Sequence, residues 1–393
     1  MNHSADFTLS PRVRAAAWFL VALAAVMIAI GLFAWPDRTW PNLLLNGFYV
    51  TSATVSALLF LSIERLTGAR WAAGLRRIPE AFLPALPVAA VLLLLVAAGR
   101  EAVFPWLRPG AAASESAGGA AYLRPSFIFP RMAVVLISWI VFAWLFRRTS
   151  LEQDRNPQSS LHYHYRLTRY STIFGVVFAV TFTACAYDWI SALEPSWSST
   201  MFGVYLFAGM FVQGIAAITL ATVKLSKTGD LASVVKPSLL HDLGKLLFAF
   251  SIFWAYIWIC QYLLIWYSNI PDEVTHYWKR TNGWWLALFA VNLIVNWVIP
   301  FFALLPARAK RNPRVLTVVC VCILCGHWLD LYLLITPESW NTPRLGFFEL
   351  IAAAGYAALI FLLVTRSLSR APLVPLHDPI LAAEEAYEVG VHS

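Results

Sequence analysis

The sequence predicts an all-α, polytopic membrane protein with about ten transmembrane helices. Hydrophobic residues make up 60% of its 393 positions and charged residues only 13%. The apolar residues gather in ten segments, and a helix of about 20 residues spans a hydrocarbon core of about 30 Å. Backbone inside lipid must satisfy its own hydrogen bonds, which makes the helix the expected structure for each segment. The predicted helices cover residues 15–35, 43–63, 81–99, 126–146, 170–193, 200–223, 246–270, 283–305, 315–336 and 346–365.

The distribution of basic residues predicts the orientation of these helices. Of the 29 Lys and Arg residues, 21 lie in the two termini and the 2–3, 4–5, 6–7 and 8–9 connections, and 8 lie on the opposite side. Cytoplasmic loops carry the excess of basic residues. We therefore expect a multi-pass protein of the bacterial cytoplasmic (inner) membrane with both termini in the cytoplasm. The net charge of +8 reflects this topology rather than nucleic-acid binding, because the basic residues form no continuous patch.

The chain is expected to form a single integral membrane domain over residues 1–393. The spacing permits helices 2–5 and 6–9 to form two four-helix bundles, with helices 1 and 10 peripheral. Residues 100–125 are predicted to be an external loop whose stretch Ala111–Ala121 is mobile, and residues 147–169 a cytoplasmic loop. Residues 366–393 are predicted to be a cytoplasmic tail that either contacts a neighbour or is disordered.

Ligands for an internal redox cofactor are missing from the sequence. All five cysteines lie inside hydrophobic segments, whereas iron–sulfur binding needs several thiolates that converge from loops. Of the eight histidines only His327 lies well inside a segment, and a membrane-embedded haem needs pairs of them on facing helices. We therefore expect no cofactor and no metal in this chain, and no self-contained catalysis.

Polar residues at membrane depth are costly, and they mark candidate functional sites. Asp188, His327 and Asp330 lie in the outer halves of their segments, and a carboxylate beside an imidazole can hold a proton and pass it on. A second group lies at the cytoplasmic start of segment 7, and neutral polar residues lie between the two. The alternatives are a structural His–Asp pair, anchoring at the interface, and hydrogen bonds that join helices. The second group is His241, Asp242 and Lys245, and the neutral residues are Tyr256, Gln261, Asn292 and Asn296.

Several motifs resemble a known family. They cover most of residues 170–340, and they are Asp188–Ser191, Leu193–Gly203, His241–Phe250, Phe253–Tyr256, Gln261–Tyr267, Trp297 with Pro300–Phe302, and His327–Tyr332. In these stretches the chain resembles the F subunit of bacterial alternative complex III, a quinol:electron-acceptor oxidoreductase. The first third of the chain and the tail carry little of this resemblance.

The resemblance implies a polysulfide-reductase-type (NrfD-like) membrane fold of two four-helix bundles with two peripheral helices. It implies a cofactor-free subunit beside a paralogous ten-helix subunit that carries the quinol site. The other partners it implies are an iron–sulfur subunit and pentahaem and monohaem cytochrome c subunits. In that family the proposed role of the subunit is structural, with a route for proton translocation.

The sequence thus favours a non-catalytic membrane subunit of a quinol-oxidising complex that passes protons through two half-channels. In this hypothesis His241, Asp242 and Lys245 serve the cytoplasmic mouth, and Asp188, His327 and Asp330 serve the periplasmic side. Three alternatives stay open: a quinol-binding catalytic anchor, a purely structural scaffold, and a secondary transporter. The transporter is disfavoured because the helix-interior prolines do not pair between two halves of the chain.

Overall fold

The computed structural model describes residues 7–108, 122–229 and 231–381. The all-α prediction is confirmed: the described residues contain ten helical spans that are long and apolar enough to cross a membrane. The predicted mobile stretch Ala111–Ala121 lies outside the described residues. The spans are α1 (Pro11–Ala34), α2 (Pro36–Leu66), the interrupted run from α3 (Arg77–Phe82) through α4 (Leu86–Leu94) to α5 (Arg100–Val103), α7 (Pro125–Arg155), α8 (Ser160–Trp189), α9 (Phe202–Leu225), α11 (Pro237–Ser268), α13 (Trp284–Leu293) with α14 (Ile299–Leu304), α15 (Pro313–Ile335) and α16 (Phe347–Leu368).

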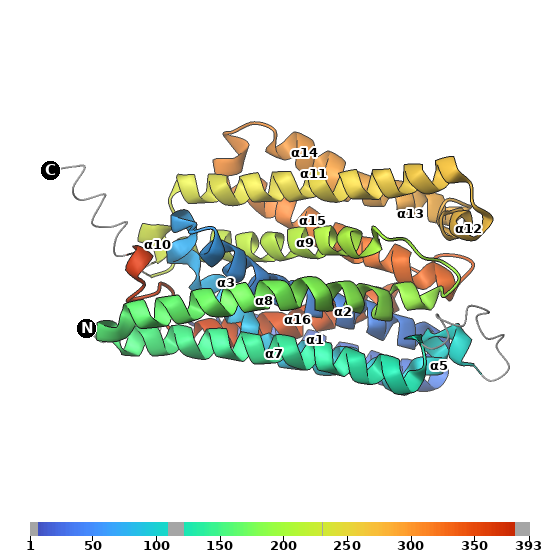
Figure 1. The fold of residues 1–393 in the computed structure, drawn as a ribbon, viewed down its shortest axis with the longest axis horizontal. Helices are drawn as coiled ribbons and strands as arrows, with labels where there is room; N and C mark the ends of the chain where they lie inside the picture. The colour runs from blue at the N-terminus through green and yellow to red at the C-terminus, as the bar shows by residue number, and fades with distance from the viewer. Residues whose placement is uncertain (1–6, 109–121, 230, 382–393) are drawn as a thin grey trace.

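The helices lie side by side along the long axis of the molecule (Figure 1). One end carries the short helix α10 (Leu231–Val234), the start of α1 and the end of α16, and we call it the basic end. The opposite end carries α5 and the short helix α12 (Pro271–Arg280), and we call it the α12 end. The sequence did not predict α12.

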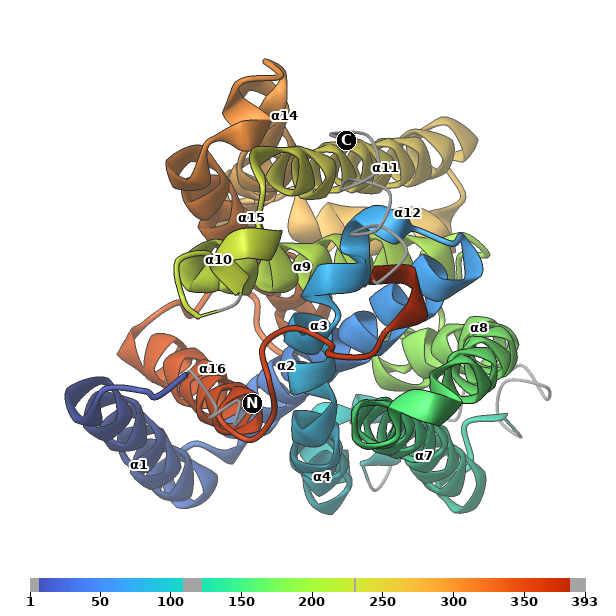
Figure 2. The ribbon, with the colours of Figure 1, turned by 90° about the vertical axis from the view of Figure 1, so that its left-hand side faces the viewer.

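Helix contacts reproduce the two predicted bundles. The first bundle joins α2, the α3–α5 span, α7 and α8, and the second joins α9, α11, α13 with α14, and α15 (Figure 2). Helix α2 packs against α8 and α9 and so connects the bundles. Helices α1 and α16 pack mainly against each other, and α1 is the least buried of the spans. Helices α2, α9 and α15 are the most buried, so the core lies along these three.

Proline fixes where many of these helices begin, because its φ suits the first turn and its missing N–H has no helical partner there. Pro11, Pro125 and Pro313 all occupy this position. Inside the third span, Pro84 and Pro87 interrupt the α-helix with a short 3₁₀ turn, Leu83–Ala85.

The connection that the sequence predicted as a loop over residues 147–169 is mostly helical. Helix α7 continues to Arg155 and α8 begins at Ser160, so only a short turn joins them. The prediction failed because arginines and tyrosines are acceptable helix formers outside the lipid, and hydropathy locates only the apolar part of a helix.

The described part of the tail, residues 371–381, folds back onto the basic end of its own chain. Leu373 and Asp378 are buried, and Asp378 pairs with Arg76. The guanidinium groups of Arg76 and Arg65 hold the pKa of Asp378 below its usual value, although burial alone would raise that pKa. This part of the tail is therefore packed against its own chain rather than disordered, and residues 382–393 lie outside the described part.

Candidate functional site: a buried Asp330 in the second bundle

Asp330 on α15 lies at the centre of a hydrogen-bond network to which every helix of the second bundle contributes. Tyr205 Oη of α9 donates to Oδ1 over 2.5 Å, and Asn292 Nδ2 of α13 donates to the same oxygen over 2.8 Å. Trp254 Nε1 of α11 donates to Oδ2 over 3.2 Å. The residue is only 4% exposed. Three donors from three helices therefore hold one carboxylate inside the bundle, and hydrogen bonds to a charged group are the strong ones.

His327 lies one helical turn from Asp330 on the same face of α15. Its Nδ1 is 4.0 Å from Asp330 Oδ2, which is too far for a direct hydrogen bond. Neither ring nitrogen bonds any described protein atom, although the residue is only 3% exposed. A Cβ at Gly209 would lie 3.3 Å from His327 Nδ1, so this glycine allows α9 to approach the ring closely. Buried polar groups normally have a hydrogen-bond partner, so water is the expected partner of the His327 ring.

Asn296 extends the network toward the middle of the bundle through a defect in its own helix. A π-helical turn, Ile294–Val298, separates α13 from α14. Pro300 follows it and has no N–H for the carbonyl of Asn296, four residues earlier. Ser251 Oγ of α11 donates to that carbonyl over 2.6 Å instead, and Asn296 Nδ2 donates to Asn292 Oδ1 over 2.7 Å. Through this distorted turn, Ser251 of α11 is connected to Asp330 by way of Asn296 and Asn292.

Three small cavities lie along this network. The Asp330 cavity has a volume of about 20 Å³, and the His327 cavity and the α12-end cavity are each about 10 Å³. A single water needs about 10–15 Å³, so each cavity is of water size. Asp330 lines both of the first two cavities, and His276 and Arg280 line both the Asp330 cavity and the α12-end cavity. Other polar wall residues are Tyr205, Gln261 and Asn292 in the first, Ser52 and Gln213 in the second, and Ser191, Glu194 and Glu338 in the third.

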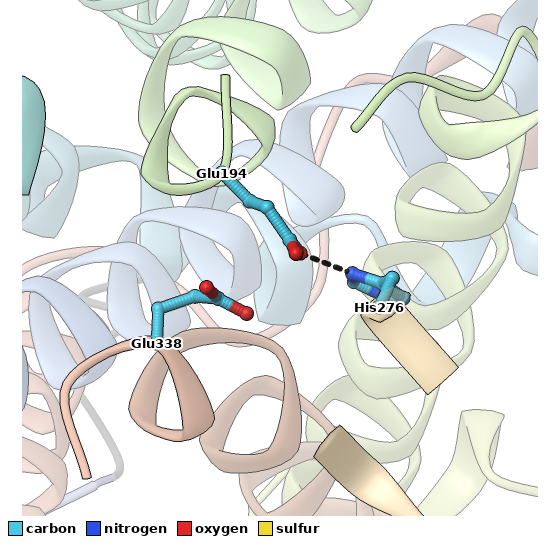
Figure 3. Close-up of side chains that lie close together, drawn as sticks. All are labelled: Glu194, His276 and Glu338. Carbon is cyan, nitrogen blue, oxygen red and sulfur yellow. Dashed lines mark hydrogen bonds and ion pairs between the residues drawn. The ribbon is translucent and has the colours of Figure 1, made fainter. Parts of the chain in front are cut away.

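A cluster of ionisable side chains closes the α12 end of this series, and Figure 3 shows three of its members. His276 Nδ1 lies 2.8 Å from Glu194 Oε2. Lys279 Nζ donates to Glu194 Oε1 over 3.0 Å and to Glu338 Oε2 over 2.7 Å. Arg280 Nη2 donates to Glu338 Oε1 over 3.3 Å. Two carboxylates therefore face one lysine, one arginine and an imidazole.

The electrostatics of the cluster keep His276 neutral. Burial, together with the charges of Arg280 and Lys279, lowers the pKa of His276 well below its usual value. The carboxylates of Glu338 and Glu194 raise the pKa of Lys279 despite its partial burial. The lysine therefore carries the titratable positive charge of the cluster at neutral pH, and the imidazole carries none.

Arg280 joins this cluster to the end of the Asp330 helix. Its guanidinium donates to the carbonyls of Leu333 over 2.8 Å, Leu334 over 3.1 Å and His276 over 2.6 Å. The first two carbonyls lie in the last turn of α15, where helix carbonyls lack intrahelical partners. Arg280 is only 2% exposed, so it is a fixed positive charge that caps α15 and ties it to α12.

Comparison with known families identifies the fold that carries this site. The family model described as polysulphide reductase, NrfD, matches residues 36–343. The chain belongs to the NrfD family. The matched region begins at the first residue of α2 and ends after α15, so it contains both bundles and leaves α1 and α16 outside. A comparison with curated proteins finds no match.

In this NrfD-family chain, five of the predicted site residues come together in the second bundle. Asp330, His327, Asn292 and Asn296 belong to the network described above, and Gln261 lines the Asp330 cavity. The spacing of three or four residues within one helix carried these predictions, because such residues share a helix face.

Two predicted residues lie away from this network. Asp188 is fully buried in the first bundle, where Arg131 of α7 donates to it over 2.6 and 2.7 Å. Tyr256 of α11 is 60% exposed and points away from the core. The sequence prediction grouped Asp188 with Asp330 because both are expected at a similar depth in the membrane. Depth alone does not determine which bundle a residue belongs to.

The predicted cytoplasmic group lies near the start of α11, at the basic end. Asp242 pairs with Lys245 over 2.6 Å, and Lys245 is largely exposed. Toward Asn296 the neighbouring rings of Phe248 and Phe301 are stacked with centroids 5.4 Å apart. Along α11, Phe248 lies between Lys245 of the predicted cytoplasmic group and Ser251 of the polar network.

Sequence reasoning missed several contributors to the site. Tyr205 lies in the first turn of α9, and Glu194 lies in the connection between α8 and α9. Neither residue shows a helical pattern with other polar residues. His276 and Arg280 are four apart on α12, a spacing that indicates one helix face, but the segment was taken as a connection. A search for i, i+4 pairs in the connections would have found them.

Proposed function

We propose that this NrfD-family chain is a cofactor-free membrane subunit of a quinol-oxidising electron-transfer complex of the alternative complex III type. The family membership and the motifs of residues 170–340 support this assignment. Its partners are a paralogous ten-helix subunit with the quinol site, an iron–sulfur subunit, and pentahaem and monohaem cytochrome c subunits. Haem c, iron–sulfur clusters and quinone belong to those partners.

The basic residues support one orientation of the chain. The termini and connections on the side of the basic end contain 21 of the 29 Lys and Arg residues. The positive-inside rule places that end in the cytoplasm of a cell with an inner membrane. The α12 end then faces the periplasm.

In this proposal protons pass through the second bundle. One observation supports this proposal most directly. Asp330 is a buried carboxylate beside a water-sized cavity, and this cavity shares His276 and Arg280 with a second one at the ionisable cluster of the α12 end. A carboxylate, an imidazole and ordered waters can pass a proton stepwise because each accepts one proton and donates another. His327 and Asp330 form the transfer centre, and the cavities form the periplasmic half-channel.

The cytoplasmic half-channel has to open during turnover. His241, Asp242 and Lys245 collect protons at the basic end, and Asn296 with Ser251 receives them near the centre. In this proposal the stacked rings of Phe248 and Phe301 close the path between them. Rotation of these side chains would admit water to one half-channel at a time, which prevents a continuous leak.

Arg280 places a fixed positive charge in the periplasmic half-channel. Its guanidinium lines both the Asp330 cavity and the α12-end cavity, and backbone carbonyls hold it in place. A fixed positive charge repels a hydronium ion that approaches from the periplasm. The same charge attracts the carboxylate of Asp330 after it has released its proton.

A quinol-binding role for the Asp330 cavity is disfavoured by its size. Its volume is about 20 Å³, whereas pockets for small organic ligands are typically about 300–1,000 Å³. The cavity accommodates water and not a quinol ring in this conformation.

Affinity purification of the full-length tagged chain from native membranes tests the complex. Mild detergent, haem staining and mass spectrometry would be applied beside membranes from an untagged strain. We expect multihaem cytochromes, an iron–sulfur protein and a second ten-helix NrfD-family protein to copurify. Recovery of a stable chain without haem-containing partners would contradict the assignment.

A further inference from the structure

The ionisable cluster at the α12 end has the donor set of a metal site. Glu194, His276 and Glu338 each offer one ligand atom, and these atoms all lie within 4.8 Å of one another (Figure 3). They come from three elements: the turn after α8, helix α12, and the 3₁₀ turn after α15. Imidazole nitrogen and carboxylate oxygen are ligands that Zn²⁺ accepts in tetrahedral sites.

A cation of the protein already occupies the position between these ligands. Lys279 Nζ lies 3.0 Å from Glu194 Oε1 and 2.7 Å from Glu338 Oε2. The Lys279 side chain is 36% exposed, and its flexible stem allows it to turn into solvent. Arg280 differs, because buried backbone carbonyls hold it in place. One positive charge of the cluster is therefore exchangeable and the other is fixed.

We propose that a divalent transition-metal ion, represented by Zn²⁺, binds Glu194, His276 and Glu338 when Lys279 turns into solvent. Two carboxylates neutralise the ion, and a water completes the tetrahedron. Zn–N and Zn–O bonds are about 2.0–2.2 Å, so the ligand atoms of a tetrahedral site lie about 3.4 Å from one another. His276 Nδ1 and Glu194 Oε2 are already 2.8 Å apart, so the Glu338 carboxylate makes the larger movement.

Two features prepare His276 as a ligand. Its ring stacks on Trp197 with centroids 3.9 Å apart and planes 11° from parallel, which fixes the direction of Nδ1. Its Nδ1 also lies 2.8 Å from Glu194 Oε2, so the nitrogen already faces another ligand of the proposed site.

Metal binding would regulate the proton route, an inference that rests on the proposed function. His276 lines both the α12-end cavity and the Asp330 cavity. A bound ion would immobilise this side chain and add positive charge at the periplasmic mouth. Zn²⁺ is therefore expected to inhibit proton release without touching the electron-transfer cofactors of the partners.

The test is Zn²⁺ binding to the full-length purified chain in detergent, measured by competition with a fluorescent chelator. Lys279→Met removes the competing cation and is expected to tighten binding at least 10-fold, a gain that misfolding cannot produce. His276→Ala and the isosteric Glu338→Gln are expected to weaken it at least 10-fold. Lys245→Met is the matched control, because Lys245 pairs with Asp242 at the opposite end and its loss should leave the Zn²⁺ affinity unchanged.

X-ray absorption at the zinc edge identifies the ligands, and we expect one imidazole nitrogen among oxygen donors. Absence of saturable binding in both the wild type and Lys279→Met would overturn the metal site and leave the proton route untouched. Binding that survives His276→Ala unchanged would also overturn it. Binding as expected, but with no effect of Zn²⁺ on proton release by the intact complex, would retain the metal site and contradict the periplasmic half-channel.

Discussion

Replacement of Arg280 by glutamine should destabilise the chain more than the loss of any surface arginine. The guanidinium supplies hydrogen bonds to three backbone carbonyls, at 2.6, 2.8 and 3.1 Å, and contacts Glu338 at 3.3 Å. Glutamine is too short to reach the last turn of α15. The carbonyls of Leu333 and Leu334 would then lie buried without a donor at the end of the helix that carries Asp330.

The magnitude follows from the burial of these groups. A buried polar group left without a partner costs about 1–3 kcal/mol, and breaking a buried charged contact costs about 3–5 kcal/mol. Lys279 still neutralises Glu338 in the variant, so the uncompensated loss is mainly that of the two helix-end carbonyls. For these two carbonyls together we expect a loss of about 2–6 kcal/mol in the free energy of unfolding.

Thermal unfolding of the purified chain in detergent, followed with a thiol-reactive dye, measures this loss. The matched control is Arg148→Gln, because Arg148 also pairs with a glutamate, Glu152, at 2.8 Å, but is 59% exposed. An exposed pair of this kind contributes about 0.2–1 kcal/mol. The Tm of Arg280→Gln should therefore fall several times further than that of the control. Equal Tm shifts in the two variants would refute the role of Arg280 as the cap of α15.

Two further predictions concern the tail and the distorted helix. Because the folded-state pKa of Asp378 lies below the unfolded value of about 3.9, its pairing with Arg76 stabilises the tail above about pH 4 and is lost as the pH falls through that lowered pKa. Protection of the amides of residues 371–381 from hydrogen exchange, relative to intrinsic exchange at the same pH, should fall below about pH 4 in the wild type and already be low at pH 7 in Asp378→Asn. Equal protection in both proteins at pH 7 would contradict the pairing. A Cβ added at Gly326 would lie 2.3 Å from Asn296 Oδ1, so Gly326→Ala should lower stability by about 1–3 kcal/mol in thermal unfolding. Gly175→Ala, whose Cβ would meet its nearest neighbour at 4.0 Å, should cost nothing, and a similar loss in both variants would argue against a tight contact at Asn296.

The membrane-spanning fold was predictable from the sequence because hydropathy and helix length are local properties. All ten spans were expected, and their apolar portions match the helices of the structure. The ends of the helices were not predicted correctly, because α7 and α8 continue well past the lipid with arginine and tyrosine residues. Helix α12 was missed for the same reason: it is polar and lies outside the lipid.

The candidate site was predictable only where its residues share one helix. His327 with Asp330, and Asn292 with Asn296, follow from spacings of three and four residues. Tyr205 could not be assigned, because its bond to Asp330 joins positions 125 residues apart. Asp188 was grouped with Asp330 by depth, but Arg131 holds it in the other bundle. Contacts between helices, which decide such assignments, leave no periodic signal in one sequence.

Proton translocation through Asp330 is tested by the ratio of protons released to electrons transferred in proteoliposomes that contain the intact complex. Asp330→Asn keeps the size of the side chain but removes its ability to take up and release a proton. Asp188→Asn is the matched control, because Asp188 is also buried but lies in the first bundle, paired with Arg131. We predict that Asp330→Asn lowers the proton-to-electron ratio while electron transfer continues, and that Asp188→Asn leaves the ratio unchanged. An unchanged ratio in a folded, electron-transferring Asp330→Asn complex would contradict the proton route through the second bundle.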